Sequence, residues 1–210
     1  MKLYSNDLTD QAPIPSRFAF GKPDPDDHMQ LSDNLSPHLA WSGAPKGTRS
    51  FVLLCMDPDV PSVADEVNQE GKVLPADMPR VAFCHWAMID IDPSVTELLT
   101  GACSDGVTPK GKKNPPGPAG SRQGLNDYTG FMAGDPDMAG QYYGYDGPCP
   151  PWNDQRLHHY VFTVYALDVD QLDVDADFGA GDVLEVINGH VLEKARLTGT
   201  YTLNPDLGAG

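Results

Sequence analysis

Residues 51–61 read Phe-Val-Leu-Leu-Cys-Met-Asp-Pro-Asp-Val-Pro, an unbroken apolar run that ends among aspartates and prolines. A short apolar run bounded by prolines is typical of a strand buried on both faces. Proline lacks a backbone donor and favours an extended residue before it, so we expect the strand to stop at Asp57. A carboxylate fixed there can face a concave site, although Asp57 and Asp59 could equally cap a turn.

Two other apolar runs each carry a histidine, and both are predicted to be strands. His85 lies within residues 81–91, and His158 begins residues 158–167. Three core strands from distant parts of the chain would then present one aspartate and two histidines, which could meet in one polar pocket. Because side chains alternate along a strand, His158 and His159 should point to opposite faces.

Composition excludes several classes of protein. A length of 210 residues without a convincing linker predicts a single domain over residues 1–210. The formal charge of −16 would repel a phosphate backbone, so we expect no nucleic-acid binding. No window approaches the roughly 18 apolar residues of a membrane span, and no apolar signal segment follows a basic start. We therefore expect a soluble, cytoplasmic protein.

The chain is rich in turn-forming residues, which favours a loop-rich β protein. It contains 21 Gly and 20 Pro, and nearly all of its acidic residues are Asp. Residues 101–157 have almost no apolar periodicity, and loops of that length are usually functional or disordered. Their aromatic content favours an ordered excursion that covers the sheet or pairs two subunits as a homodimer. The basic cluster of this excursion, Lys110, Lys112, Lys113 and Arg122, predicts a solvated loop face, with contact to an anionic partner as the alternative.

One helix near the C-terminus is predicted. It should begin at Asp182, with Glu185 completing a capping box, and end near Gly189. Residues 190–194 are expected to add a helical turn before a final strand from Leu197. The four cysteines show no metal-binding spacing, and a bridge between Cys103 and Cys149 has no support in the sequence.

Three separated motifs resemble the phosphatidylethanolamine-binding protein family, in its bacterial Raf-kinase-inhibitor-like (YbhB/YbcL) branch. They are Asp-Pro-Asp-Val-Pro at 57–61, His-Trp at 85–86, and Gly-Pro at 147–148 followed by His-His-Tyr at 158–160. The resemblance implies a mainly β fold. We expect an antiparallel β-sandwich with a Greek-key-type sheet and a few short peripheral helices, one of them near the C-terminus.

The resemblance also implies a small surface pocket for phosphate, phosphorylated head groups or similar anionic ligands. Asp57, His85 and His158 would form its polar core, Gly147 and Pro148 its rim, and Tyr160 would lie nearby. This chain has His159 where the family often has arginine. Its loops at 62–84 and 101–157 are enlarged, which affects the size of the ligand and the choice of partner.

From these residues we expect a non-enzymatic binding protein. A phosphate would accept hydrogen bonds from protonated His85 and His158 and from amides near Gly147, while Asp57 orients a histidine. No catalytic residue, cofactor or metal is expected. The alternative is a metal-dependent or acid–base hydrolase that uses Asp57, His85 and His158. Regulation of a partner kinase or protease is an expectation from family analogy alone.

Overall fold

The computed structural model describes residues 1–208, in which three sheets account for most of the regular structure. The largest sheet contains, in spatial order, β2 (Ala12–Pro13), β11 (Val191–Tyr201), β10 (His158–Leu167), β6 (Ser50–Pro61), β7 (Arg80–Ile91) and β9 (Arg122–Gln123). A second sheet contains β1 (Lys2–Tyr4), β5 (Leu39–Ser42) and β8 (Glu97–Leu98). The third is the pair β3 (Gly21–Asp24) and β4 (His28–Leu31). The helices are α1 (Tyr128–Phe131), α2 (Ala180–Val186) and the 3-10 turns η1 (Ser16–Phe18), η2 (Met132–Gly134) and η3 (Pro205–Leu207).

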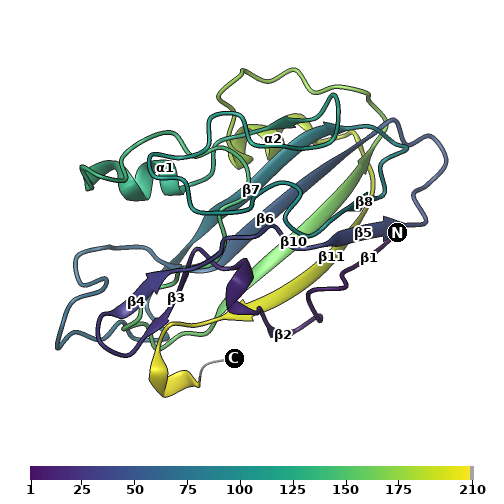
Figure 1. Ribbon diagram of the computed structural model, residues 1–210. Coiled ribbons are helices and arrows are strands. Elements are labelled where there is room, and N and C mark those ends of the chain that lie inside the picture. Colours follow the sequence, from purple (N-terminus) through teal and green to yellow (C-terminus); the bar gives the residue numbers. More distant parts are fainter. Residues whose placement is uncertain (209–210) are drawn as a thin grey trace.

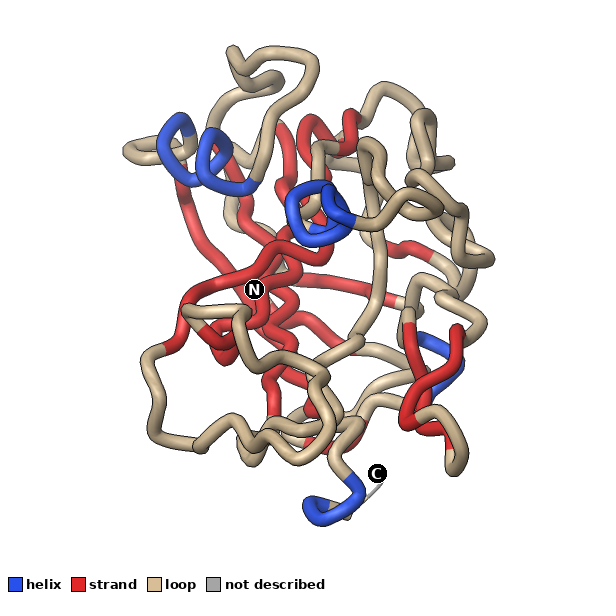
Figure 2. Tube along the Cα trace, turned by 90° about the vertical axis from the view of Figure 1, so that its left-hand side faces the viewer, coloured by secondary structure: helices blue, strands red, loops and turns tan. Residues whose placement is uncertain are grey.

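The large sheet is covered on both faces, which makes the fold a layered, mainly β structure. All pairings are antiparallel except that of β2 with β11. Figure 1 shows the long strands side by side, with α2 on one side of the sheet and β1 and β5 on the other. Loops surround these strands over much of the molecule (Figure 2). No helix within residues 1–208 is long and apolar enough to cross a lipid bilayer.

Strand β6 is buried on both faces, as its apolar run predicts. Phe51 and Leu53 pack into the core that includes Trp41 of the second sheet, whereas Val52 and Leu54 pack into the core beneath α2. Alternation of side chains along a strand requires this division. The sequence therefore places β6 in the middle of the fold.

The expectation that this strand ends at Asp57 is wrong. β6 continues to Pro61 and pairs with β7 as far as Arg80. The register shifts between Asp57 and Val60, so Pro58 and Asp59 lie in an irregularity that has no ladder partner. Proline is tolerated there because no ladder hydrogen bond requires its missing N–H.

The helix near the C-terminus is present, but its start lies earlier than predicted. Gly179 is the N-cap of α2, and Asp182 occupies the third helical position, where its carboxylate accepts a hydrogen bond from Gly179 N–H at 2.8 Å. Glu185 is therefore not the capping-box acid. The predicted helical turn at 190–194 is also wrong, since β11 begins at Val191 and pairs with β10 there.

Residues 101–157 are ordered and run along the β7 side of the large sheet. They contain β9, α1 and η2, and they bury aromatic rings including Tyr142 and Tyr145. Their backbone bonds to β7 where Gly124 N–H donates to Ala87 O and Asp146 N–H to His85 O. The four cysteines are free, so Cys103 and Cys149 are not bridged. This excursion brings loop residues to the middle of β7, where His85 lies.

Candidate functional site

One cavity lies where β6, β7 and β10 meet the loop before β10. Asp57, His85, His158 and Tyr160 all line it, although they come from three strands that are distant in sequence. Its volume is about 90 Å³, which is room for several waters or one small polar group, since a water needs about 10–15 Å³. The structure thus brings together four of the six residues that sequence reasoning selected.

The rest of the wall is mainly apolar. It consists of side chains from the end of β6, from β7, α1 and the segment after β6, and from the proline-rich loop: Val60, Pro61, Ala64, Val67, Asn68, Phe83, Tyr128, Phe131, Cys149, Pro150 and Pro151. Apolar walls reduce the local dielectric, which strengthens any hydrogen bond to a charged group.

Gly147 and Pro148 lie behind this wall, and Cys149, Pro150 and Pro151 line the cavity instead. A Cβ on Gly147 would lie 2.0 Å from Phe18 O, so only glycine allows the two backbone segments to approach so closely. Gly147 N–H donates to Asn34 Oδ1, and Pro148 O accepts from the N–H groups of Phe20 and Gly21. The amide of Gly147 is therefore already used within the protein.

His158 is held between two carboxylates. Its Nδ1 lies 2.6 Å from Asp57 Oδ2, and its Nε2 lies 3.1 Å from Asp154 Oδ2. Burial would lower the pKa of His158, but the hydrogen bonds to Asp154 and Asp57 outweigh it and raise the pKa to about 9. His158 is thus charged at neutral pH, with both ring nitrogens occupied and no donor left for a ligand.

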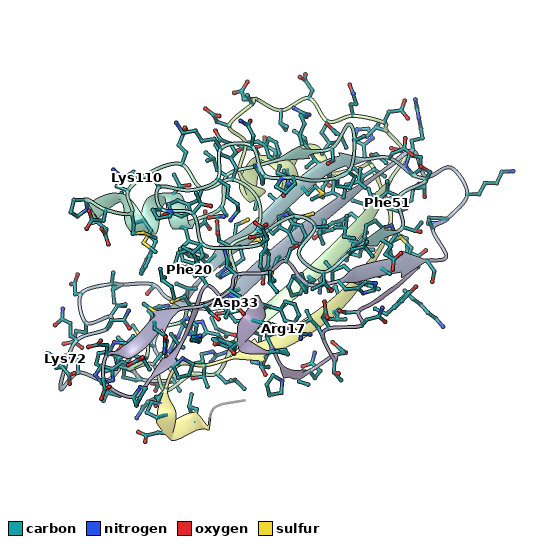
Figure 3. The ribbon with its side chains drawn as sticks, in the orientation of Figure 1. Arg17, Phe20, Asp33, Phe51, Lys72 and Lys110 are labelled. Atoms are coloured by element: carbon teal, nitrogen blue, oxygen red, sulfur yellow. The ribbon has the colours of Figure 1, made fainter. Side chains whose placement is uncertain are left out.

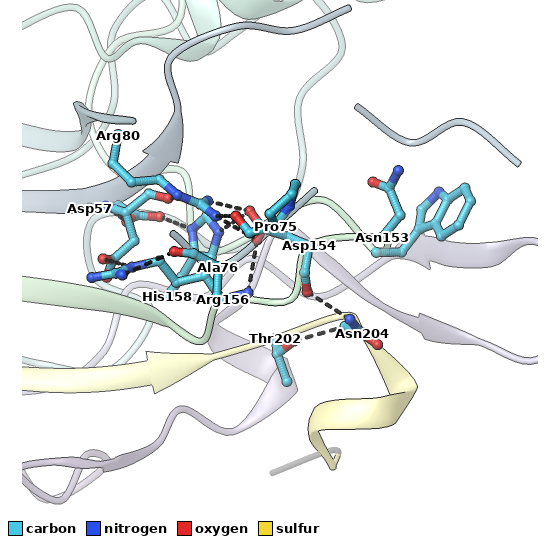
Figure 4. Close-up of polar contacts among 12 residues, drawn as sticks. Asp57, Pro75, Ala76, Arg80, Asn153, Asp154, Arg156, His158, Thr202 and Asn204 are labelled. Atoms are coloured by element: carbon cyan, nitrogen blue, oxygen red, sulfur yellow. Dashed lines mark hydrogen bonds and ion pairs between the residues drawn. The ribbon is translucent and has the colours of Figure 1, made fainter. Parts of the chain in front are cut away.

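Arginines balance the surrounding carboxylates (Figure 4). Arg80 forms a two-pronged ion pair with Asp154, through Nη1 at 2.5 Å and Nη2 at 3.0 Å. Arg156 donates to Asp59 Oδ1 at 2.5 Å. With His158 charged, each positive charge of this network faces a negative one. The acidic residues of the network therefore leave no strong uncompensated charge beside the cavity.

His159 points away from the cavity, as the alternation rule predicts. Its backbone N–H and its Nδ1 both bond to Asp59 Oδ2, at 3.0 and 2.7 Å, and its side chain is 40% exposed. A charged residue at this position therefore contacts the β6 irregularity and the solvent, and does not line the pocket.

His85 has one nitrogen engaged and one open. Its Nδ1 lies 2.8 Å from Asp146 O, and a carbonyl oxygen only accepts, so Nδ1 carries a proton. Nothing within residues 1–208 bonds to Nε2. Burial lowers the pKa of His85 below the usual histidine range, against an opposing effect of the Asp57 carboxylate. At neutral pH Nε2 is therefore an unprotonated acceptor that faces the cavity.

Sequence reasoning missed the supporting network. Asp154 and Arg80 lie in loop and strand-end positions with no motif around them, and only the fold places them beside His158. The one signal available was the spacing of Asp154 four residues before His158, which is not diagnostic in a loop. No motif in the sequence indicates Tyr128 either, yet its ring lies 5.5 Å from that of His85.

The segment 62–74 forms one side of the cavity mouth. Asn68 N–H donates to Asn153 Oδ1 at 3.0 Å, while Asn68 Oδ1 accepts from Trp152 N–H at 3.0 Å. Asn153 Nδ2 also donates to Glu66 O at 2.9 Å. Figure 3 shows Lys72 of this segment far from Phe51, at the opposite end of the molecule. The segment is thus attached to the loop before β10 through the side chain of Asn153, through Trp152 N–H, and through the backbone bonds of Leu74 to residues 153 and 155.

No metal centre is evident at this site. Among residues 1–208, no three or more His, Cys, Asp or Glu side chains are grouped so that they could hold a metal ion. In the expected triad of Asp57, His85 and His158, both ring nitrogens of His158 are already bonded to carboxylates.

Comparison with known proteins agrees with the fold and motifs. Residues 4–202 match the family model described as phosphatidylethanolamine-binding protein. The chain is 32% identical over 202 residues to UPF0098 protein YbhB of Escherichia coli, covering 96% of this chain and 100% of that one. It is 34% identical over 201 residues to a UPF0098 protein of Methanothermobacter thermautotrophicus, covering 96% and 98%.

Solved structures agree as well. The crystal structure of Escherichia coli YbcL, described as a new member of the mammalian PEBP family, superposes with a TM-score of 0.67 at 28% identity, covering 96% of this chain and 97% of that one. Because the family model spans nearly the whole chain and the relatives align end to end, the chain belongs to the phosphatidylethanolamine-binding protein family, in its bacterial YbhB/YbcL branch.

Proposed function

We propose that the cavity binds small ligands that carry a phosphate or a similar anionic group, with His85 as the main contact. Family membership supports a non-enzymatic ligand-binding protein. The observation that carries the finer proposal is His85 Nε2, which lines the cavity and has no partner within residues 1–208.

The proposal differs from the sequence-based one in how the anion is held. His158 is charged but gives both of its hydrogen bonds to carboxylates, and the amide of Gly147 is occupied by Asn34. Binding of an anion would therefore be coupled to the uptake of a proton from solvent at His85 Nε2, and the anion would accept a charge-assisted hydrogen bond from the protonated ring. Such bonds contribute roughly 1.5–3 kcal/mol. Tyr160 Oη, which has no partner elsewhere in the described chain, supplies a second donor.

This mechanism predicts a proton uptake with a definite sign. The pKa of His85 lies below its usual value in the free protein, so the ring is neutral at pH 7. Binding an anion stabilises the charged form and raises that pKa. Affinity is then highest at acidic pH and falls, by up to about tenfold per pH unit, as pH rises above the pKa of the free protein.

The test is calorimetric titration with dimethyl phosphate and with phosphoethanolamine at pH 5.5 and 7.5. The diester keeps one negative charge throughout, so any change in its affinity reports on the protein. We expect tighter binding at pH 5.5, with proton uptake visible as a dependence of the heat on buffer. His85→Gln should abolish both effects.

His190→Gln is the matched control, because His190 pairs with Asp168 on the exposed surface and is not part of the cavity wall. It should bind like the unmodified protein. Binding that does not depend on pH, or that survives in His85→Gln, would show that His85 is not the anion contact and would overturn the proposal.

A further inference from the structure

Asp146 contacts His85 through both of its backbone polar groups. Asp146 O accepts the hydrogen bond from His85 Nδ1, and Asp146 N–H donates to His85 O at 3.1 Å. The first bond decides the tautomer of the neutral ring, because it fixes the proton on Nδ1 and leaves the lone pair on Nε2. Any shift of Asp146 along the chain would therefore disturb the ring that faces the cavity.

The carboxylate of Asp146 is what holds this backbone in place. It is fully buried and accepts three hydrogen bonds, from Asn34 Nδ2 at 2.8 Å, Asn126 Nδ2 at 2.8 Å and Lys112 Nζ at 2.6 Å. The three donors come from three separate loops. Only Lys112 carries a charge, and a buried carboxylate without a cationic partner is strongly destabilising.

Lys112 differs from the lysines beside it in sequence. Its side chain is 11% exposed and reaches inward, whereas Lys110 and Lys113 lie on the surface. Glycine makes this approach possible, because a Cβ on Gly111 would lie 2.1 Å from Gln141 O. The basic cluster of the long excursion is thus not only a solvated face, since one of its members is part of the structure behind the pocket.

The hydrogen bonds around the Asp146 carboxylate also help to fix Tyr128, which forms another part of the cavity wall. Asn126 Oδ1 accepts from Tyr128 N–H at 3.1 Å, and Tyr128 Oη donates to Gly147 O at 2.7 Å. The Tyr128 ring meets that of His85 edge to face, with an interplanar angle of 80°. Asp146 therefore connects the orientation of His85 to that of its aromatic neighbour.

We propose that Lys112 and Asp146 are positioning residues, which keep His85 in the tautomer that opens Nε2 to the cavity. The expected effect of these two residues on affinity rests on the proposed anion-binding function. Their effect on the tautomer of His85 does not depend on any ligand. The polar and titratable groups that face His85 come from β6, from β10 and from two parts of the excursion, the start of α1 and the loop before β10. They are Asp57, Tyr160, Asp127, Tyr128 and Asp146. Of these, only Asp146 touches Nδ1.

The experiment measures the ring nitrogens of His85 by ¹⁵N NMR in the ligand-free protein, and the affinity for dimethyl phosphate in parallel. In the unmodified protein we expect a single Nδ1–H tautomer. Lys112→Met should give a mixture of tautomers and weaken binding by roughly tenfold, by analogy with the lower end of the effect of residues that orient metal-binding histidines. Lys112→Arg should restore both readouts.

Lys113→Met is the matched control, since it removes the same charge from an exposed neighbour. It should leave both readouts unchanged. Asp146→Asn, which keeps the shape of the side chain, is the second variant if Lys112→Met does not fold, and we expect the same mixture of tautomers from it. An unchanged tautomer in the folded variants would overturn the proposal. A changed tautomer in a protein that binds no phosphate ester would support positioning by Lys112 and refute the anion-binding function alone.

Discussion

Replacing His158 with asparagine tests how the charge at the base of the cavity stabilises the fold. In the folded protein the ring lies between Asp57 and Asp154, and its side chain is fully buried. Burial would lower the pKa of His158, yet the two carboxylates raise it from 6.5 to about 9. A group whose pKa is raised on folding stabilises the folded state below its unfolded pKa, and this stabilisation is lost as pH rises through the folded value.

The size of the effect follows from these two values. The gap between 6.5 and about 9 corresponds to roughly 3 kcal/mol in the free energy of unfolding, at about 1.36 kcal/mol per pKa unit. That contribution should be complete below pH 6.5 and almost absent above pH 9. Arg80, which stays charged throughout, continues to balance Asp154 at high pH.

The assay is urea unfolding of the unmodified protein and of His158→Asn at several pH values from 6 to 9.5. Other groups that titrate in this range, including the cysteines, contribute equally to both proteins. We therefore expect the unmodified protein to lose about 3 kcal/mol more than the variant over this range. If the two proteins show parallel pH dependence, the ring of His158 is not held charged by its carboxylates and the reasoning is refuted.

Three further predictions concern the core, the cavity mouth and a helix cap. Trp41→Ala removes a buried ring whose centre lies 5.5 Å from that of Phe51, and should lower the free energy of unfolding by about 3–5 kcal/mol. Leu99→Ala at an exposed site should change it by no more than about 0.5 kcal/mol. Equal losses of the two variants in urea unfolding would contradict this prediction. Asn153→Ala removes the side-chain bonds to Asn68 N–H, Glu66 O and Lys72 O. Hydrogen exchange in 62–74 should therefore accelerate while that of β10 stays slow, and unchanged exchange would show that other contacts hold the segment. Asp182→Ala removes the acceptor of Gly179 N–H and a negative charge from the first turn of α2, and should cost about 0.3–1 kcal/mol in thermal or urea unfolding. A neutral result would mean that the apolar packing of Ala180, Val183 and Ile187 is enough to fix the helix.

The central strands could be predicted because runs of consecutive apolar residues indicate strands that are buried on both faces. A strand covered on both faces must be apolar at every position, and the run from Phe51 to Met56 satisfies this. The ends of elements were less predictable. β6 passes through Pro58 because tertiary pairing with β7 continues around an irregularity, and residues 190–194 are a strand because β10 offers them a partner. The β-propensity of a segment does not show which strand it will pair with in the folded protein.

The motifs likewise indicated which side chains gather at the cavity. Asp57 and His85 lie within β6 and β7, and His158 and Tyr160 lie at the start of β10, so the pairing of these strands brings the four side chains together. The hydrogen bonds of the two histidines to the loops could not be predicted, because the partners are the loop residues Asp154 and Asp146. The placement of those residues depends on the folding of segments without periodicity.

The sequence by itself determined the mainly β architecture, the central strand and the set of polar residues available to one pocket, because burial and alternation constrain every residue of a strand. Only the tertiary structure decided how charge and protons are distributed among those residues. His158 is charged since two carboxylates bracket it, and His85 is neutral since burial outweighs its neighbours. A pKa depends on the surroundings of a group in space, and those surroundings are assembled from loops whose course no local pattern specifies.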